Sequence, residues 1–244
     1  MTIRIAMWSG PRNLSTAMMR SFGSRSDTFV SDEPFYGCFL KTTDADHPMR
    51  EETIAEMDCD WRSVMGDLRG PAPDGSPVWY QKHMWHHMAG PIGYDDFEGF
   101  RHAFLIREPE RMIGSYLRKR ESATFDDFGL ARQAEFFDRA ADRLGHAPPV
   151  IDANDVLANP EGVLSNLCHA LGIAWDPAML SWNPGRRDTD GPWAPHWYGA
   201  VEKSIGFGSP ETGLVELPDD ARPLADRCRP YYERLASHRI RAKP

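Results

Sequence analysis

The sequence lacks the features that several large protein classes require. It has no GxxxxGK[ST] loop of the kind that nucleotide triphosphatases use. Its four cysteines are scattered and none forms a CxxC pair, a pattern typical of reduced thiols rather than of a disulfide framework. No stretch approaches the ~20 apolar residues that a membrane span needs, and no charged segment followed by an apolar run marks a secretory leader. We therefore expect a cytoplasmic protein with no membrane partner.

Positive charge is also scarce. The chain holds 28 Lys and Arg against 36 Asp and Glu, a formal net charge of −8 at pH 7. This balance argues against nucleic acid as a partner, but it leaves room for a local anion site, because helix ends outweigh a distant net charge. Hydrophobic residues make up 41% of the 244 residues, enough for one substantial core. Without internal repeats or low-complexity tracts, we expect a single domain over residues 1–244.

Short apolar runs alternate with helical patterns along most of the chain. Strands are expected at 3–8, 28–31, 78–82, 102–106 and 149–152, and helices at 14–23, from 109, at 127–145, from 160 and at about 219–238. Such alternation predicts an α/β fold with a doubly wound parallel sheet in three layers. A polar insertion at 40–77 is expected over the top of the sheet. An aromatic loop at 181–213, rich in Gly and Pro, is expected to form a lid or pocket wall.

The first expected strand ends in a tight turn, and a helix follows at once. This arrangement cradles phosphate in many proteins, because a helix N-terminus offers free backbone N–H groups and a partial positive charge. Gly10 would let the backbone approach an oxygen-rich ligand, and the planar guanidinium of Arg12 matches phosphate or sulfonate. Ser15 and Thr16 would place hydroxyls in the first helical turn. The alternative is an ordinary Gly-Pro turn with Ser15 or Thr16 as the helix cap.

A second candidate begins with Arg107, at the end of the clearest apolar strand. A residue at the carboxyl end of a buried strand faces the crevice in which doubly wound sheets bind ligands. Ser115 follows two helical turns later and neighbours Arg111, Arg118 and Lys119 at helical spacings of three and four. A hydroxyl among these cations suits a second phosphate. The alternative is a solvated basic helix face.

Together, the two motifs resemble the cofactor-binding loops of the sulfotransferase family, in its bacterial sulfotransferase-like subgroup. Residues 11–16, PRNLST, stand where the family has a PKSGTT-type loop for a 5'-phosphosulfate. The family's 3'-phosphate motif is matched by Arg107, Pro109, Ser115 and Tyr116. Residues 151–160, IDANDVLANP, resemble a further family segment that precedes a late helix. The resemblance implies a P-loop nucleotide-binding-like fold.

The resemblance also implies an activity: transfer of a sulfuryl group from 3'-phosphoadenosine-5'-phosphosulfate (PAPS) to a hydroxyl or amine of a small-molecule acceptor, leaving the product nucleotide PAP. Cofactor contacts would come from Ser9, Gly10, Arg12, Asn13, Leu14, Ser15, Thr16, Arg107 and Ser115. Arg12 and Lys82 would act in catalysis by stabilising the sulfonate oxygens, with no metal required. The chain departs from the family in two places. Arg12 replaces the catalytic lysine, which keeps the charge but not the proton donation, and residues 203–208 stand in for the KGxxGDWK-type loop.

The expected general base follows the strand at 78–82, where the segment QKHMWHH contains three histidines. Transfer to a hydroxyl needs a group that takes its proton, and histidine near neutral pH suits this role. We expect His83, or failing that His87, to be the base, with His196 as the competitor from the aromatic loop. The alternative is that these histidines only pack and form hydrogen bonds locally, without a catalytic role. A metal site at His83 and His87 would lack an acidic or cysteine partner at the usual spacing.

Two other functions remain open from the sequence alone. A nucleotide-dependent kinase or hydrolase would need a P-loop lysine, which is absent, and a strand-end acid for magnesium, for which Asp32 is available. A non-catalytic phosphonucleotide-binding protein would keep the fold and lose turnover. The sequence is also compatible with a homodimer. The residues expected to wall the acceptor pocket are Trp61, Trp182, Trp193, Trp197 and Tyr198.

Overall fold

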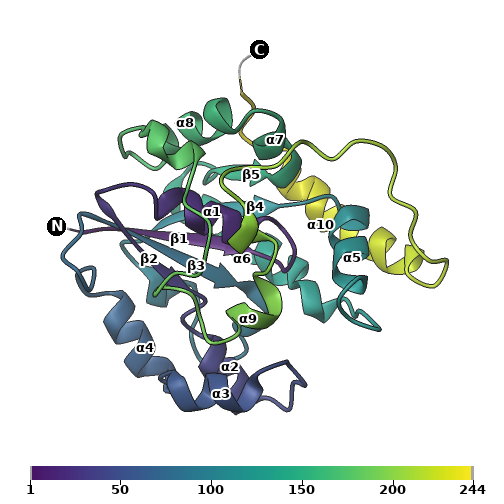
Figure 1. Ribbon diagram of the computed structural model, residues 1–244, viewed down its shortest axis with the longest axis horizontal. Helices are drawn as coiled ribbons and strands as arrows, with labels where there is room; N and C mark the ends of the chain where they lie inside the picture. Colours follow the sequence, from purple (N-terminus) through teal and green to yellow (C-terminus); the bar gives the residue numbers. More distant parts are fainter. Residues whose placement is uncertain (1, 243–244) are drawn as a thin grey trace.

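A five-stranded parallel sheet forms the centre of the computed structural model, which describes residues 2–242 (Figure 1). The strands are β1 (Ile3–Ser9), β2 (Thr28–Asp32), β3 (Val78–Met84), β4 (Arg101–Ile106) and β5 (Val150–Asp152). Their order is β2-β3-β1-β4-β5, and all neighbouring pairs are parallel. The chain therefore winds to one side of β1 and then to the other, and all carboxyl ends meet at one edge, where sheets of this kind bind ligands.

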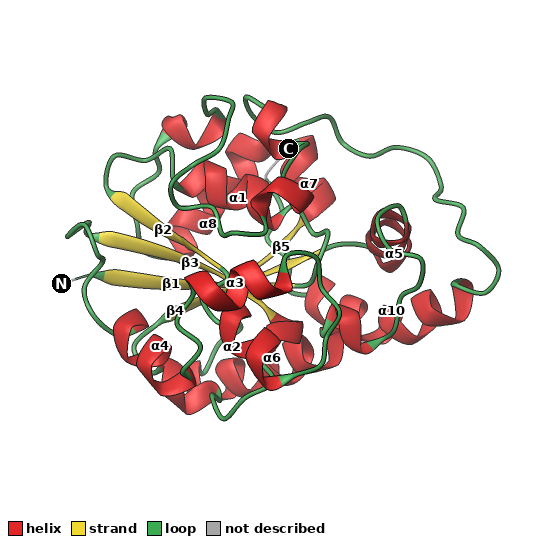
Figure 2. Cartoon of the chain, turned by 60° about the horizontal axis from the view of Figure 1, so that its bottom comes forward, coloured by secondary structure: helices red, strands yellow, loops and turns green. Residues whose placement is uncertain are grey.

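Helices cover both faces of the sheet, so the predicted three-layer α/β fold is confirmed (Figure 2). One face carries α1 (Ser15–Phe22) and α8 (Pro160–Ala170), and the other carries α4 (Trp61–Leu68), α6 (Leu130–Leu144) and α10 (Arg222–Ala236). Phe22 of α1 stacks on Tyr80 of β3, and Phe136 of α6 packs against Trp8 of β1. Because both faces are covered, every residue of β3 is buried, as expected for a parallel sheet.

Most predicted elements are present, with boundaries that differ by one to three residues. β3 continues to Met84, two residues beyond the expected end. The helix expected at 127–145 is interrupted near its start, where Gly129 has a φ of 62° between a short 3-10 turn (Asp126–Phe128) and α6. A β-carbon at Gly129 would lie 2.4 Å from that of Trp85, so both conformation and space require glycine. The single-domain prediction includes residues 1 and 243–244, which lie outside the described residues.

The polar insertion at 40–77 is more deeply packed than expected. It follows α2 (Tyr36–Thr42) and contains α3 (Arg50–Glu56) and α4. Val64, Met65 and Leu68 of α4 belong to the main hydrophobic core, so this helix covers a face of the sheet instead of lying over its top. Two further helices each follow a strand, α5 (Pro109–Leu117) after β4 and α7 (Ala153–Ala158) after β5. Within residues 2–242, no helix is both long and apolar enough to cross a membrane.

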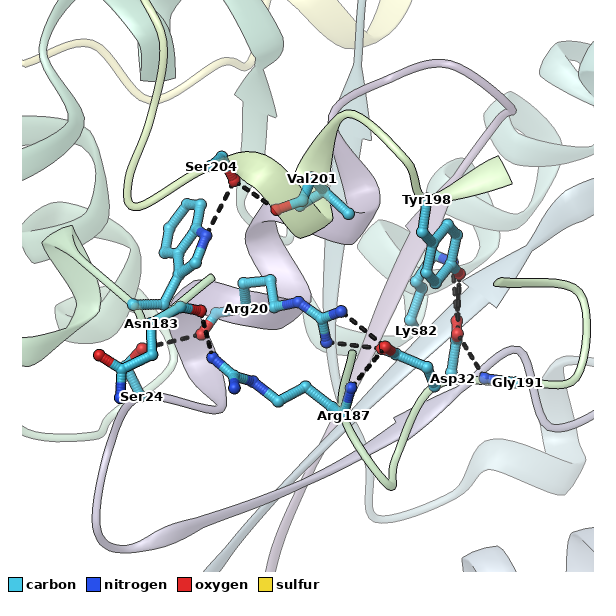
Figure 3. A network of polar contacts seen from close by, with 12 residues as sticks. Arg20, Ser24, Asp32, Lys82, Asn183, Arg187, Gly191, Tyr198, Val201 and Ser204 are labelled. Carbon is cyan, nitrogen blue, oxygen red and sulfur yellow. Dashed lines mark hydrogen bonds and ion pairs between the residues drawn. The ribbon is translucent and has the colours of Figure 1, made fainter. Parts of the chain in front are cut away.

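The aromatic loop at 181–213 carries the short helix α9 (Ala194–Trp197) and is tied to α1 by a buried ion pair. Arg20 donates two hydrogen bonds to the carboxylate of Asp190, at 2.5 and 2.7 Å, and water reaches almost none of either side chain. The backbone N–H of Arg187 donates to the same carboxylate at 2.8 Å (Figure 3). A buried charge needs an opposite charge beside it, because an unpartnered charge in the interior is costly. The pair therefore fixes this loop against α1.

Removing the acid of this pair should destabilise the protein strongly. Asp190→Ala leaves the guanidinium of Arg20 buried and unpaired, so we expect a loss of about 3–5 kcal/mol in the free energy of unfolding, measured with urea. Asp95→Ala is the matched control. Asp95 pairs with Arg143 at the exposed surface, and its loss should change stability by less than about 1 kcal/mol. Equal small losses for both variants would contradict the role given to the buried pair.

Candidate active site

Two cavities lie at the carboxyl edge of the sheet and share part of their walls. The inner cavity, of about 100 Å³, reaches the buried side chains at the ends of β2 and β3. The outer cavity, of about 340 Å³, lies between the first turn of α1 and the segment at 200–208. Both are bordered by Arg12, Ser15, Thr16, Trp197 and Tyr198. A ligand that spans both would therefore pass Arg12 and the start of α1.

The loop between β1 and α1 presents free polar groups to the outer cavity. Arg12 and Leu14 have φ values of 62° and 71°, and α1 begins without a side chain that caps its N–H groups. The side chain of Asn13 is fully buried, and within the described part of the chain neither its oxygen nor its nitrogen finds a hydrogen-bond partner. Uncapped N–H groups and an unpartnered buried amide beside a cavity are groups that an oxygen-rich ligand would satisfy.

Positive charge gathers around the outer cavity. Nε of Arg12 donates to the hydroxyl of Ser115 at 3.1 Å, and Arg107 donates to the backbone carbonyl of Arg12. Burial, and then the nearby guanidinium groups of Arg107 and Arg118, lower the pKa of Arg12. Guanidinium groups this close repel one another, so an anion placed among them is stabilised. Here the anion beside Arg107 is the carboxylate of Glu211.

Beneath the inner cavity, the buried ammonium of Lys82 joins the ends of β2 and β3. It donates to Asp32 at 2.7 Å and to the hydroxyl of Tyr198 at 2.7 Å (Figure 3). It also donates to the carboxylate of Glu33. Burial lowers the pKa of Lys82, but Asp32 and Glu33 raise it more, so it lies well above its usual value. Two carboxylates face one ammonium, which leaves an excess of negative charge in a buried cluster.

Glu33 relieves this excess by holding a proton near neutral pH. Burial, and then the carboxylate of Asp32, raise its pKa to about 7 against the attraction of Lys82. Its backbone has a φ of 45°, which is uncommon for a residue other than glycine. One carboxyl oxygen bonds Lys82, and the other lies 3.5 Å from Nδ1 of His87. A carboxyl group that titrates near neutral pH beside a cavity is suited to proton transfer.

The histidines of the segment QKHMWHH lie in different surroundings. His87 and His86 both border the inner cavity, and the ring of His87 stacks on Tyr36 with centroids 4.1 Å apart. His83 points to the other side of β3, where it packs between Trp8 and Phe97 and is 1% exposed. Successive residues of a strand face opposite sides, so His83 does not share the side of Lys82.

These positions correct the expectation for the general base. Burial lowers the pKa of His83 to about 3, and this side chain does not border the inner cavity. His87 reaches the cavity, but burial, and then the neighbouring His86, lower its pKa well below the usual value. His196 is exposed on α9 and packs against Trp197 rather than toward Lys82. Glu33 shares the inner cavity with His87, and it combines this position with a pKa of about 7.

The predicted cofactor-binding residues divide into two groups. Those that border the outer cavity are Arg12, Asn13, Leu14, Ser15, Thr16, Arg107 and Ser115. Ser9 and Gly10 lie below the loop and do not border it, because the hydroxyl of Ser9 donates to the Gly10 carbonyl at 2.6 Å inside the core. A β-carbon at Gly10 would lie 2.8 Å from the carbonyl oxygen of Phe128. Packing, rather than the approach of a ligand, therefore explains this glycine.

The residues predicted to wall an acceptor pocket lie in different places. Trp193, Trp197 and Tyr198 border the inner cavity. Trp61 does not, because it stacks on Phe35 within the core. Trp182 does not either, because its indole N–H donates to the hydroxyl of Ser204 at 2.9 Å.

Sequence reasoning missed several side chains that border the inner cavity, among them Glu33, Tyr36 and His47. The hydroxyl of Tyr36 is hydrogen-bonded to Nδ1 of His47 at 2.7 Å. For Glu33 the sequence did carry a signal, since an acidic pair directly after a strand lies at the carboxyl edge of a parallel sheet. Tyr36 and His47 follow in helical and polar sequence, where nothing indicates an approach to β3.

Within residues 2–242 the side chains form neither a metal-binding cluster nor a disulfide. Among residues 2–242, no group of three or more His, Cys, Asp or Glu side chains is placed to hold a metal ion. All four cysteines are free thiols, namely Cys38, Cys59, Cys168 and Cys228. Burial raises the pKa of Cys38 to about 12, so this thiol is not poised to react as a thiolate.

Known proteins with similar sequences align with most of this chain. A family model described as "Sulfotransferase domain" matches residues 3–239. Two proteins of Arabidopsis thaliana, branched-chain-amino-acid aminotransferase-like proteins 2 and 1, are 34% and 36% identical over 234 and 235 residues. The alignments cover 96% of this chain but only 41% and 42% of those proteins, so the chain spans about two fifths of their length.

Solved structures share the fold at low sequence identity. The sulfotransferase domain from the curacin biosynthetic pathway has a TM-score of 0.57 and 18% identity, covering 94% of this chain and 97% of that chain. A sulfotransferase from Alicyclobacillus acidocaldarius has a TM-score of 0.56 and 15% identity, covering 98% of this chain and 97% of that chain. Identities this low concern the fold alone.

The raised pKa of Glu33 should be visible in the pH dependence of stability. A carboxyl with a higher pKa in the folded than in the unfolded state loses stability as the pH rises between those values, here from about 4.5 to 7. Relative to Glu33→Gln, the wild type should therefore lose up to about 3 kcal/mol over this range in urea unfolding. Glu56→Gln, at an exposed position, controls for the loss of charge. The free energy of unfolding of the wild type, taken relative to that of Glu33→Gln, should therefore fall as the pH rises. A relative value that stays flat or rises would refute the raised pKa of Glu33.

Proposed function

Because this chain belongs to the sulfotransferase domain family, we propose that it moves a sulfuryl group from PAPS to a hydroxyl or amine of a small molecule. The observation that carries this proposal is the meeting of two chemically different cavities at Arg12. The outer one has cations and free helix N–H groups, and the inner one has a carboxyl that titrates near neutral pH. The donor would lie in the outer cavity and the acceptor in the inner one.

The outer cavity offers groups that fit both ends of the donor nucleotide. Arg12, the uncapped N–H groups of α1 and the hydroxyls of Ser15 and Thr16 would hold the phosphosulfate. Arg107 and Ser115 would hold the 3'-phosphate, since a guanidinium binds phosphate through two parallel hydrogen bonds. The unpartnered amide of Asn13 supports this fit. When bound, PAPS would supply the sulfuryl group, whose bond to the nucleotide phosphate breaks as a bond to the acceptor oxygen or nitrogen forms.

Glu33 is the side chain best placed to take the proton of the acceptor. Its pKa of about 7 leaves a substantial fraction ionised at neutral pH, and a base works best when its pKa lies near the working pH. Lys82 holds Glu33 in place and adds positive charge at the inner cavity, which Arg12 also borders. The proton lost by the acceptor would thus remain on Glu33, beside Lys82, until it passes to solvent.

The environment of Asp32 favours sulfuryl transfer over a magnesium-dependent kinase. One oxygen of Asp32 accepts from Lys82 at 2.7 Å, and the hydroxyl of Tyr198 donates to both oxygens at 2.9 and 2.7 Å. The N–H of Gly191 donates to the second oxygen at 3.2 Å. Because both oxygens of Asp32 already accept hydrogen bonds inside the protein, this carboxylate is poorly placed to bind magnesium.

Calorimetry with PAP and with ATP plus magnesium tests the donor site. We expect PAP to bind without magnesium and more tightly than ATP. Arg107→Ala should weaken PAP binding by about 10- to 100-fold, because a charge-assisted hydrogen bond contributes ~1.5–3 kcal/mol, and should change 5'-AMP binding much less. Arg143→Ala, on the surface of α6, removes the same charge as a control. Equal losses for PAP and 5'-AMP would show that Arg107 has a structural role only.

Single-turnover transfer tests the base, with an acceptor found by screening small alcohols, phenols and amines against labelled PAPS. Glu33→Gln should lower the rate by about 10²–10⁴-fold, and only the wild-type rate should rise with pH through the pKa of Glu33. His83→Phe keeps the aromatic packing against Trp8 and should retain most of the rate. A normal rate for Glu33→Gln together with an inactive His196→Ala would place the base on the later loop.

A further inference from the structure

The anion site at Arg107 is filled by a carboxylate of the chain itself. Glu211 accepts from Nε of Arg107 at 3.2 Å and from a second nitrogen of the same guanidinium. A nitrogen of Arg111 lies 4.0 Å from this carboxylate. Burial raises the pKa of Glu211, but the hydrogen bond from Arg107 and the charges of Arg107, Arg111 and Arg118 lower it more, so the group is ionised. A negative charge therefore already occupies the place where the proposed function puts a 3'-phosphate.

Glu211 stands on a lightly tied segment. Residues 207–218 contain no helix or strand, and Figure 1 shows this stretch as the yellow-green loop that runs out from the body of the molecule before α10. Leu214, near its tip, is 99% exposed. Polar ties between this stretch and the body include the N–H of Glu211 to Asn154 at 2.8 Å and Arg111 to the carbonyl of Gly213 at 2.8 Å. The apolar anchors of this stretch lie to either side of Glu211, at Phe207, Val215 and Leu217. The part around Glu211 itself has few buried contacts, and such parts open at low free-energy cost.

Arg107 does not need Glu211 to keep its position. Its guanidinium also donates to the backbone carbonyl of Arg12, which belongs to the loop between β1 and α1. Arg107 itself follows directly after β4, a buried strand. The carboxylate therefore neutralises a guanidinium that the fold already holds in place.

We propose that Glu211 is an internal competitor for the 3'-phosphate of the nucleotide, and that it lowers the affinity for PAP and speeds its release. This inference rests on the proposed function. Carboxylate and phosphate bind a guanidinium through the same two hydrogen bonds, so only one can occupy Arg107 at a time. As PAP leaves, the return of Glu211 restores a negative charge beside the partly buried guanidinium of Arg107. A nucleotide without a 3'-phosphate can bind while Glu211 stays on Arg107. The competition therefore lowers the affinity only for nucleotides that carry a 3'-phosphate, such as PAP.

The test is calorimetry of Glu211→Gln with PAP and with 5'-AMP, together with the dissociation rate of PAP. The substitution removes the charge and nearly keeps the shape. We expect PAP to bind at least about fivefold more tightly and to dissociate more slowly, with 5'-AMP binding within about twofold of the wild type. Glu216→Gln removes an exposed carboxylate from the same segment and should change neither affinity.

Each other outcome has a definite meaning. Unchanged PAP binding would show that the pair is only a surface ion pair, and weaker PAP binding would show that Glu211 positions Arg107; both results overturn the inference. Equal tightening for PAP and 5'-AMP would overturn it too, since the 3'-phosphate would not be involved. If wild-type protein binds PAP no better than 5'-AMP and Arg107→Ala changes neither, the proposed donor site fails, and the inference fails with it.

Discussion

The positive charge of Lys82, buried where β3 ends, must be balanced inside the protein, and much of the site is arranged around this need. An unpartnered charge in the interior costs several kcal/mol. Asp32 and Glu33 from the end of β2 and Tyr198 from the later loop meet this demand at one point. Segments more than a hundred residues apart are thereby held together at the carboxyl edge. The pair between Arg20 and Asp190 does the same for the loop and α1.

The same balance makes Glu33 reactive. Burial, and then the second carboxylate beside the same ammonium, raise the pKa of Glu33. Glu33 also has an unusual backbone conformation, a feature that is common where a fold serves a functional group at some expense of stability. The requirement for charge balance and the supply of a proton acceptor thus have a single physical origin.

The outer cavity shows the reverse arrangement. There, guanidinium groups are in excess, and the carboxylate that covers Arg107 belongs to a segment without regular structure. The acids around Lys82 stand at the rigid end of a strand, so their pairing is permanent. Glu211 is attached to the fold by few contacts, so its pairing can be exchanged. The attachment of the acid, rather than the strength of the ion pair, distinguishes a structural contact from an exchangeable one.

The sequence by itself determined the order of strands and helices, because apolar periodicity and turn residues are local properties. It also predicted that one crevice would hold Arg12, Ser15, Thr16, Arg107 and Ser115, because parallel strands end at a common edge. It pointed to His83 as the general base and did not single out Glu33. A shift of one residue along a strand reverses the side a residue faces, and β2 lies beside β3 rather than beside β1. Only the tertiary structure decided which carboxylate meets which cation, because burial and the distance between charges from remote segments set each pKa.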